Sequence, residues 1–426
     1  MDKVRGQGFV VSELTGFGWN LPQRVHHFDA VIVLTFSQRQ TSMLKEFCLD
    51  RRAKIGLSAL TIFAALVLLA VTTRTYAPKT GSIASTGAPR AARFSHTATL
   101  LSDGRVLIAG GMERNGYWLD SAEIYNPETG HFSPARSMLS RRAGAMAVRL
   151  PSGKVLIAGG TDGSGSSLRT TEIYDPAGNV FTPGPNMLSP RSHGVAILLK
   201  DGRVLIAGGC AQGDDQRLAS AEIYDPAAQT FSWTGSMHVP RGAFNAVALA
   251  DGRVLVAGGM SSGQLPDPTI EASAETYDPA TGRFTLTSPM SVPRYKHGMA
   301  LLKDGRALII GGQNGGAFGQ RLSSTEFFDP ETSSFSRGPE MKYPRFKLIQ
   351  GVAVLGDGHV LVAGGADQPE MYDPHNETFV PVSGPKLDGY LFSTATVLDD
   401  GTVLLVDGYG KHPTAGAVRQ AWLWQP

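Results

Sequence analysis

One nine-residue phrase occurs seven times between Asp103 and Gly408, with copies that begin about 50 residues apart. The third copy reads DGRVLIAGG, and the others differ from it at a few positions. Self-similarity at this period is typical of a chain built from one supersecondary unit stacked on copies of itself. The repeat therefore constrains the fold more than any other feature of the chain. The copies occupy residues 103–111, 152–160, 201–209, 251–259, 304–312, 357–365 and 400–408.

Each repeat contains four short apolar runs separated by turn residues. In the third repeat these runs are HGVAILLK (193–200), RVLIAGG (203–209), AEIYDP (221–226) and TFSWTGSM (230–237). An Asp-Gly pair, which is typical of turns between antiparallel strands, separates the first two runs. No helical period occurs in the region. Four antiparallel strands repeated seven times predict an all-β fold, a seven-bladed β-propeller of four-stranded antiparallel blades.

An aromatic pair follows the glycine doublet in six repeats, and its two members always lie seven positions apart. Together, the doublet and the aromatic pair resemble the Kelch repeat, including bacterial-type Kelch proteins and the propeller of galactose oxidase. The resemblance covers residues 81–426. Kelch repeats usually have tryptophan where this chain has phenylalanine, a change of volume that leaves the predicted fold intact. The pairs are Tyr125/Phe132, Tyr174/Phe181, Tyr224/Phe231, Tyr277/Phe284, Phe328/Phe335 and Tyr372/Phe379.

The seventh repeat lacks its fourth apolar run. Its third run, AWLWQP (421–426), aligns with AEIYDP so that Trp424 stands at the tyrosine position. Before the first repeat, IASTGAPRAAR (83–93) aligns with the fourth run of the third repeat. We expect residues 82–88 to complete the outer edge of the last blade, which protects strand edges that would otherwise be open to aggregation.

Residues 55–73 form an uncharged apolar run of 19 residues, IGLSALTIFAALVLLAVTT. This length spans a bilayer as a helix. A cleaved signal peptide is the alternative, but its apolar core is normally shorter, about 7 to 15 residues. We favour a signal anchor with the propeller (81–426) on the extracytoplasmic side, or secreted if the run is cleaved. Residues 1–54 then form a cytoplasmic tail or a misassigned start, and residues 74–80 form a linker.

The charge balance provides no strong electrostatic case for nucleic-acid binding. The chain has 39 Lys and Arg against 37 Asp and Glu, a net charge of +2, and it contains no basic run. Its two cysteines, Cys48 and Cys210, would lie on opposite sides of the membrane. We therefore expect one free thiol in the propeller and no disulfide.

Recognition is expected on one face of the propeller. The segments after each doublet and the entries to the first strands share this face, and the former vary most between repeats. Variable loops on a fixed frame are where recognition usually occurs. The resemblance to Kelch proteins implies binding of a protein or glycan partner through side chains just after the doublet and two or three positions into the first strand. These residues are Met112, Thr161, Cys210, Met260, Gln313 and Tyr409 and, around the channel mouth, His96, His193, Phe244, Lys296, His297 and Phe392.

An arginine opens six repeats, and a glutamate recurs two positions before the first aromatic of the same six. The arginines could form a cationic ring that binds carboxylates. The seventh repeat lacks both residues, however, and their joint loss indicates an Arg–Glu pair that serves the blade. We favour the structural pair over a binding ring. The residues are Arg93, Arg142, Arg191, Arg241, Arg294 and Arg345, with Glu123, Glu172, Glu222, Glu275, Glu326 and Glu370.

Three histidines, His96, His193 and His297, could converge on the channel as a metal site. No close His, Asp or Glu ligand spacing supports such a site, so we expect no metal and no cofactor. The aspartates of the Tyr-Asp-Pro turns are expected to cap those turns.

An enzyme is the alternative function. Copper-radical oxidases resembling galactose oxidase need two tyrosines, two histidines and a Cys–Tyr thioether, with one ligand from a further C-terminal domain. The last repeat ends at Pro426, so we expect no such domain, and the S-x-D-x-G boxes of sialidase-type propellers do not occur in the sequence. A sugar epimerase stays open, because such a site needs only a few polar groups at the channel mouth. We expect a membrane-anchored, extracytoplasmic Kelch-repeat binding protein, with a carbohydrate-active propeller enzyme as the alternative.

Overall fold

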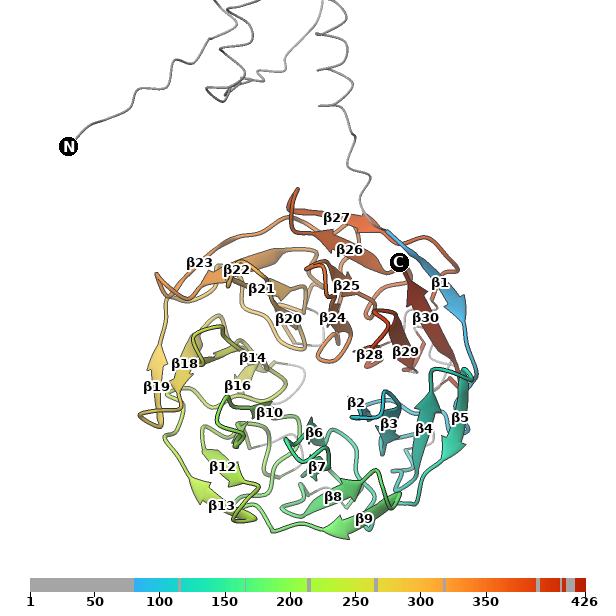
Figure 1. Ribbon diagram of the computed structural model, residues 1–426. Helices are drawn as coiled ribbons and strands as arrows, with labels where there is room; N and C mark the ends of the chain where they lie inside the picture. Colours follow the sequence, from blue (N-terminus) through green and yellow to red (C-terminus); the bar gives the residue numbers. More distant parts are fainter. Residues whose placement is uncertain are drawn as a thin grey trace, which may run out of the picture. The chain divides into compact units, whose positions relative to one another are not determined.

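Seven four-stranded antiparallel sheets surround a central channel as the blades of a propeller (Figure 1). They belong to a computed structural model that describes residues 80–426, except 114–115, 165, 213–215, 264–266, 317–318, 388–390, 407 and 411–417. The all-β, seven-bladed prediction is confirmed. The predicted tail at 1–54, the predicted span at 55–73 and the linker up to residue 79 lie outside the described residues. Within the described ranges, no helix is long and apolar enough to cross a membrane.

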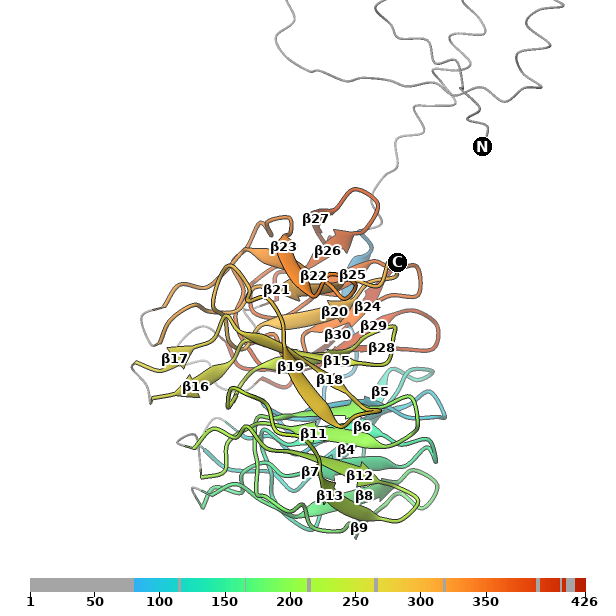
Figure 2. The ribbon, with the colours of Figure 1, turned by 90° about the vertical axis from the view of Figure 1, so that its left-hand side faces the viewer.

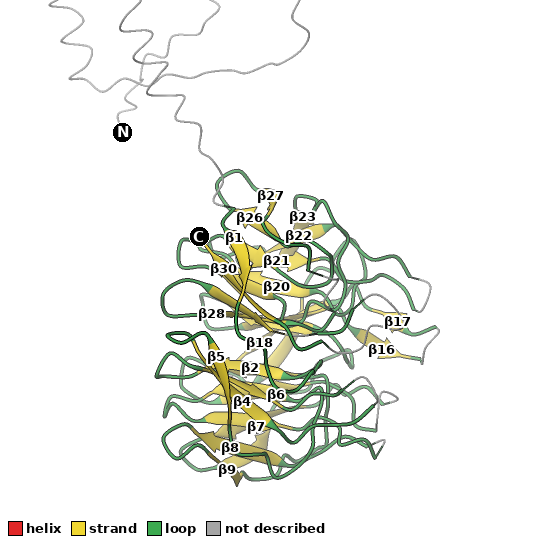
Figure 3. Cartoon of the chain, turned by 90° about the vertical axis from the view of Figure 1, so that its right-hand side faces the viewer, coloured by secondary structure: helices red, strands yellow, loops and turns green. Residues whose placement is uncertain are grey.

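The strands of blades one to six follow the chain from the channel to the rim. Blades one to three consist of β2 (Thr97–Leu100), β3 (Val106–Ala109), β4 (Ala122–Asn126) and β5 (His131–Pro134); β6 (Met146–Arg149), β7 (Val155–Ala158), β8 (Thr171–Asp175) and β9 (Val180–Pro183); and β10 (Val195–Leu198), β11 (Val204–Ala207), β12 (Ala221–Asp225) and β13 (Thr230–Trp233). Blades four to six consist of β14 (Asn245–Ala248), β15 (Val254–Ala257), β18 (Ala274–Asp278) and β19 (Arg283–Leu286); β20 (Gly298–Leu301), β21 (Ala307–Ile310), β22 (Thr325–Asp329) and β23 (Ser334–Arg337); and β24 (Val352–Val354), β25 (Val360–Val362), β26 (Glu370–Asp373) and β27 (Thr378–Pro381). A hairpin of β16 (Met260–Ser262) and β17 (Thr269–Ile270) projects from blade four (Figures 2 and 3).

The strands are shorter than the apolar runs that predicted them. In blade three the run 203–209 yields only β11, which ends at Ala207, because Gly208 and Gly209 have φ values of +62° and +93°. Extended strands have negative φ, so the doublet ends the strand and redirects the chain. The run 230–237 yields β13, which ends at Trp233.

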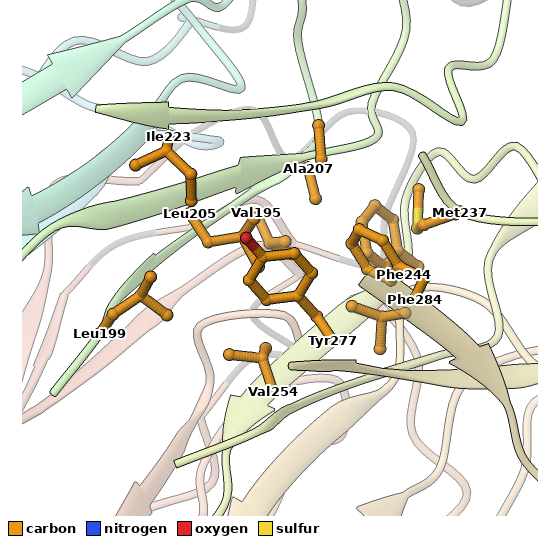
Figure 4. Packing of buried hydrophobic residues seen from close by; sticks show 12 residues of the cluster. Val195, Leu199, Leu205, Ala207, Ile223, Met237, Phe244, Val254, Tyr277 and Phe284 are labelled. Carbon is orange, nitrogen blue, oxygen red and sulfur yellow. The ribbon is translucent and has the colours of Figure 1, made fainter. Parts of the chain in front are cut away.

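The apolar core lies between neighbouring blades. Each residue of β11 is buried, as are those of the second strand in the other blades. Between blades three and four, Leu205 and Ile223 pack with Val254 and Tyr277 (Figure 4). Full burial of one such aliphatic side chain stabilises the fold by about 1.5–3 kcal/mol. The repeated phrase therefore supplies the apolar contacts that hold adjacent blades together.

The aspartates of the Tyr-Asp-Pro turns cap those turns, as predicted. In blade three, Asp225 Oδ1 accepts hydrogen bonds from the backbone N–H groups of Ala227 at 2.9 Å and Ala228 at 3.1 Å. An aspartate oxygen accepts from the backbone two residues ahead at Asp175, Asp278, Asp329 and Asp373 as well.

The N-terminal strand closes the last blade. The strand order of blade seven is β1-β30-β29-β28. In this blade β1 (Ser82–Ser85) pairs with β30 (Ala421–Gln425), which is followed by β29 (Val403–Val406) and β28 (Thr394–Val397). Ile83 lies opposite Trp424, as Phe231 lies opposite Tyr224 in blade three. The predicted closure is confirmed, with a strand of four residues inside the range 82–88. Figures 2 and 3 show β1 and the C-terminus on the side away from the β16–β17 hairpin.

Candidate functional site

Seven residues with positive φ surround the channel mouth, on the face that carries the β16–β17 hairpin. In blades one to six each is the second residue after the blade arginine, and their φ values lie between +50° and +67°. Residues other than glycine rarely adopt this conformation, so its recurrence marks a position that the propeller dictates. The residues are Ser95, Gly144, His193, Ala243, Lys296, Lys347 and Phe392.

Backbone hydrogen bonds connect these positions from blade to blade. The first five positions form a continuous series of four bonds, in which the N–H of each position after Ser95 donates to the carbonyl oxygen of the equivalent residue in the preceding blade at 2.8–3.1 Å. The series changes register after Lys296, whose carbonyl accepts from Leu348 rather than from Lys347. The mouth therefore departs from its repeat between the two lysines.

Lys296 and Lys347 lie among aromatic rings at this irregular part of the mouth. Lys347 Nζ lies 4.6 Å from the ring centroid of Tyr409 and 4.8 Å from that of Phe392, and it donates a hydrogen bond to the Tyr409 hydroxyl. Lys296 Nζ lies 5.2 Å from the same Phe392 ring. Cation–π contacts at such distances contribute about 0.5–2 kcal/mol each. We define the lysine–aromatic cluster as Phe94, Tyr295, Lys296, Phe346, Lys347, Phe392 and Tyr409.

The other rings of the lysine–aromatic cluster bring in blades one, five and six. Phe94 and Tyr409 pack edge to face with ring centroids 5.0 Å apart, and Tyr295 and Phe346 do so at 5.2 Å. Edge-to-face contacts of this kind add about 0.5–1.5 kcal/mol beyond the burial of the rings. The cluster therefore joins four blades into one packed surface around two cationic side chains.

The position of Lys347 alters its acidity. Burial lowers the pKa of the Lys347 ammonium from 10.5 to about 7, and the nearby positive charges of Lys296 and Arg321 act in the same direction. The Lys347 side chain is therefore about half protonated near neutral pH. An anion placed beside it would favour the protonated form, since opposite charges raise an ammonium pKa.

A small cavity borders the lysine–aromatic cluster. It has a volume of about 60 Å³ and is lined in part by Phe392, His96 and His193. A second cavity of about 300 Å³ shares Ile349 and Gln350 with it and is lined by the first strands of several blades. The channel mouth therefore offers room for a small group beside Phe392.

Two of the three predicted histidines, His96 and His297, are buried and neutral. Burial lowers the pKa of His96 and of His297 to about 3, and the positive charges of nearby blade arginines act in the same direction. His96 shares a 3.1 Å hydrogen bond with Thr394. In the described part of the chain, no three His, Cys, Asp or Glu side chains are arranged to hold a metal ion.

The predicted residues after each doublet occupy equivalent places, and one of them joins the lysine–aromatic cluster. Each forms an isolated antiparallel bridge with the first strand's entry, as Cys210 does with Ser192. Cys210, Met260 and Gln313 are buried, whereas Met112, Thr161 and Tyr409 are partly exposed. Tyr409 alone lies in the cluster.

Of the residues predicted around the channel mouth, some belong to the lysine–aromatic cluster and others do not. Lys296 and Phe392 belong to the lysine–aromatic cluster, while His96 and His193 line the small cavity. Phe244 is buried in the core between blades three and four. The structure therefore brings together three predicted residues, Lys296, Phe392 and Tyr409.

Sequence reasoning missed Lys347, Arg321 and the rings of Phe94, Tyr295 and Phe346. One signal was present: Lys296 and Lys347 each lie two positions after a blade arginine, in consecutive repeats. The aromatic residues follow the arginine directly, but nothing in their spacing shows that blades one and five to seven meet.

The six blade arginines are buried, each with no more than 1% exposure, and therefore do not form a binding ring. Each contacts the predicted glutamate at 2.6–3.1 Å. The preferred hypothesis of a structural Arg–Glu pair is confirmed.

Comparison with known proteins gives the same architecture. A family model described as the Kelch motif matches residues 93–139, 145–188 and 300–342. No curated protein matches the chain. Among solved structures, a fungal alcohol oxidase of the AA5 family, in complex with copper, aligns with a TM-score of 0.65 and 19% identity over 82% of this chain and 77% of that chain. At this identity the likeness shows the fold alone.

Proposed function

Because this chain is a Kelch-repeat β-propeller, we propose that it is a binding protein whose channel mouth receives a carboxylate of a protein partner. The lysine–aromatic cluster carries this proposal. It places Lys296 and Lys347 on the face that carries the variable loops. Variable loops on a fixed frame are where recognition usually occurs.

The charge of the lysine–aromatic cluster favours an anionic group. The positive charges of Lys296 and Arg321 lie close enough to Lys347 to lower the pKa of its ammonium group. Their mutual repulsion decreases when an anion lies between them. A hydrogen bond to a charged group contributes about 1.5–3 kcal/mol, which suits an acidic side chain or a C-terminal carboxylate.

The surroundings of the mouth favour a macromolecule. The cavity of about 60 Å³ has room for one small group only, whereas a stable protein interface buries about 800 Å² of surface on each partner. A protein partner would therefore also contact the surface around the mouth. The β16–β17 hairpin projects from the same face (Figure 2) and extends the surface beside the mouth. A protein partner that inserts one carboxylate into the mouth and contacts the β16–β17 hairpin would use both parts of this face.

The test is capture by the full chain and its variants, with an acidic Glu-containing peptide and its Gln counterpart as competitors. The double variant Lys296→Gln/Lys347→Gln should lower affinity for the captured partner by about tenfold or more. Lys342→Gln is the matched control, because Lys342 is exposed and lies in the same segment. Equal capture by all three proteins, or equal competition by both peptides, would contradict the proposal. Competition by an acidic glycan but by neither peptide would identify a glycan ligand and overturn the choice of a protein.

We further propose that residues 55–73 anchor the propeller in a membrane, with the mouth on the extracytoplasmic side. The length and apolar character of this run support the proposal. The position of β1, away from the mouth face (Figure 3), leaves the mouth open to a partner when the chain is tethered ahead of β1. Retention of the full chain in membranes after an alkaline wash is expected. A soluble product whose N-terminus follows residue 73 would show a cleaved signal instead.

A further inference from the structure

We propose that the central channel binds a neutral polyhydroxylated molecule the size of one sugar ring. The site is the cavity of about 300 Å³ that adjoins the small cavity at the mouth. No residue of the lysine–aromatic cluster lines this larger cavity, so the inference requires neither the protein partner nor the carboxylate of the proposed function. Three features of the channel support it: backbone groups that face inward, a lining without charge and the volume of the cavity.

The first strand of each blade is an edge strand that faces the channel (Figure 1). Alternate residues of a strand in an antiparallel pair direct both their N–H and their C=O groups away from the partner strand. In blade seven, the N–H of Ala395 donates to the carbonyl of Gln350 at 2.8 Å. In blade four, the N–H of Ala246 donates to Asn245 Oδ1 at 2.9 Å. These two alanines therefore direct their backbone groups into the channel.

Three further alanines, Ala98, Ala147 and Ala196, occupy the same register in blades one to three. Each lies opposite the third residue of the second strand, as Ala395 does in blade seven. All three line the cavity, but no hydrogen bond joins their inward N–H and C=O groups to another residue that the structure describes. Enclosed backbone groups almost always have a partner. Each of these alanines therefore offers one donor and one acceptor to a molecule in the channel.

The lining of the cavity favours a neutral ligand. Its polar side chains, among the described residues, are hydroxyls and amides, and none carries a charge. An ion in this cavity would lose hydration without gaining a countercharge, which is costly. A hydroxyl group, by contrast, donates one hydrogen bond and accepts two, so it matches the adjacent N–H and C=O groups of the alanines.

Gln350 supplies a side-chain amide to the same cavity. It is exposed and lines both cavities, and no described residue forms a hydrogen bond with its side chain. The amide of Asn245 is already in use, because it donates to the carbonyls of His297 at 3.2 Å and Ile349 at 3.3 Å. Gln350 is therefore the amide side chain of this cavity that can turn toward a ligand.

The volume of the cavity limits the size of the ligand. Ligand pockets in proteins usually have about 300–1,000 Å³, so a cavity of about 300 Å³ lies at the small end and suits one ring rather than two. Val195, Ile197 and Val352 also line it, and their apolar side chains suit the C–H groups of such a ring. A single-ring polyol combines these C–H groups with several hydroxyls.

Calorimetric titration of the full chain with myo-inositol, D-glucose and cyclohexanol tests the proposal. We expect the two polyols to bind at millimolar concentrations and cyclohexanol, a ring with one hydroxyl, to bind about tenfold more weakly or less. Glucuronate and glucosamine add one negative or one positive charge to glucose, and each should also lose about tenfold or more. Failure of both polyols to bind would overturn the proposal and leave water as the occupant of the channel. Binding of glucuronate in preference to glucose would overturn it as well, because that preference would indicate a cationic site.

A pair of variants locates the site. Gln350→Leu should weaken glucose binding about two- to tenfold, because one hydrogen bond is lost. Gln320→Leu is the matched control, since Gln320 is exposed and lines neither cavity, and it should bind as the wild-type chain does. Maltose, with two rings, should bind about tenfold more weakly than glucose or less, because the cavity suits one ring. Equal glucose binding by the two variants, or equal binding of maltose and glucose by the wild-type chain, would show that any sugar binds outside this cavity.

Discussion

Arg191 donates a hydrogen bond to Glu222 Oε1 at 2.6 Å, and both side chains are fully buried. The same carboxylate accepts the backbone N–H groups of Leu188 and Ser189. Arg191 also donates to the carbonyl of Gly208, in the glycine doublet, at 2.8 Å. The pair therefore ties the connection between blades, the doublet and the third strand together, and its equivalents recur in the first six blades.

Removing either partner of this pair should strongly destabilise the propeller. Arg191→Met and Glu222→Gln are each expected to cost about 3–5 kcal/mol, because each leaves a buried group without its partner. The double variant should lose clearly less free energy of unfolding than the sum of the losses of the two single variants. Chemical unfolding of the four proteins measures the coupling, and additive costs would argue against a structural pair.

The buried histidines should make the fold sensitive to acid. The pKa of His297 is about 3 in the folded chain, below its ordinary value of 6.5, so its contribution to stability is complete above pH 6.5. It decreases as the pH falls toward 3, because the unfolded chain takes up a proton that the folded chain does not. The slope is about 1.4 kcal/mol per pH unit.

His297→Phe should remove that slope. Phenylalanine already occupies the equivalent position in blade four, as Phe244, so the substitution suits the site. The free energy of unfolding of both proteins between pH 6 and pH 4 tests the expectation. Parallel curves would show that His297 does not titrate as its burial requires.

Closure of blade seven should depend on Ile83. This side chain is 5% exposed and belongs to a core cluster that contains Trp424, so Ile83→Asp places an unpaired carboxylate in an apolar environment. We expect a loss of about 3–5 kcal/mol, with increased aggregation as β1 detaches. Ser82→Asp is the matched control, because Ser82 lies in the same strand but is exposed. Thermal unfolding with light scattering measures both effects, and equal melting of the two variants would contradict closure by β1.

Affinity for an acidic partner should decrease between pH 6 and pH 8. The pKa of Lys347 is about 7, so its side chain is mostly protonated at pH 6 and mostly neutral at pH 8, and a carboxylate prefers the protonated form. Binding near pH 7 should therefore take up protons, which calorimetry in buffers of different ionisation enthalpy detects. Lys347→Arg stays charged and should bind with little dependence on pH. A wild-type affinity that is the same at both pH values would rule out a role for this ammonium.

The sequence by itself determined the architecture of the propeller. The repeat period, the four apolar runs and the turn pairs specify one blade, and their seven copies specify the ring, because each blade must bury its second strand against the next. The missing fourth run of the last repeat also predicted that β1 pairs with β30. Loss of the arginine and the glutamate from the same repeat favoured a structural pair over a binding ring, and the structure confirms the pair. All of these inferences depend on patterns that are local or repeated at fixed spacing.

The tertiary structure alone decided which residues of the mouth act together. Phe94 belongs to blade one and Tyr409 to blade seven, and they meet because closure of the ring makes these blades neighbours. The sequence places Lys347 two positions after a blade arginine but does not show its lowered pKa, because that pKa depends on burial and on the charges of Lys296 and Arg321. Spacing along a chain does not encode distance across a channel. The repeats therefore specify the frame, while the chemistry of the mouth arises from contacts between residues that the frame brings together.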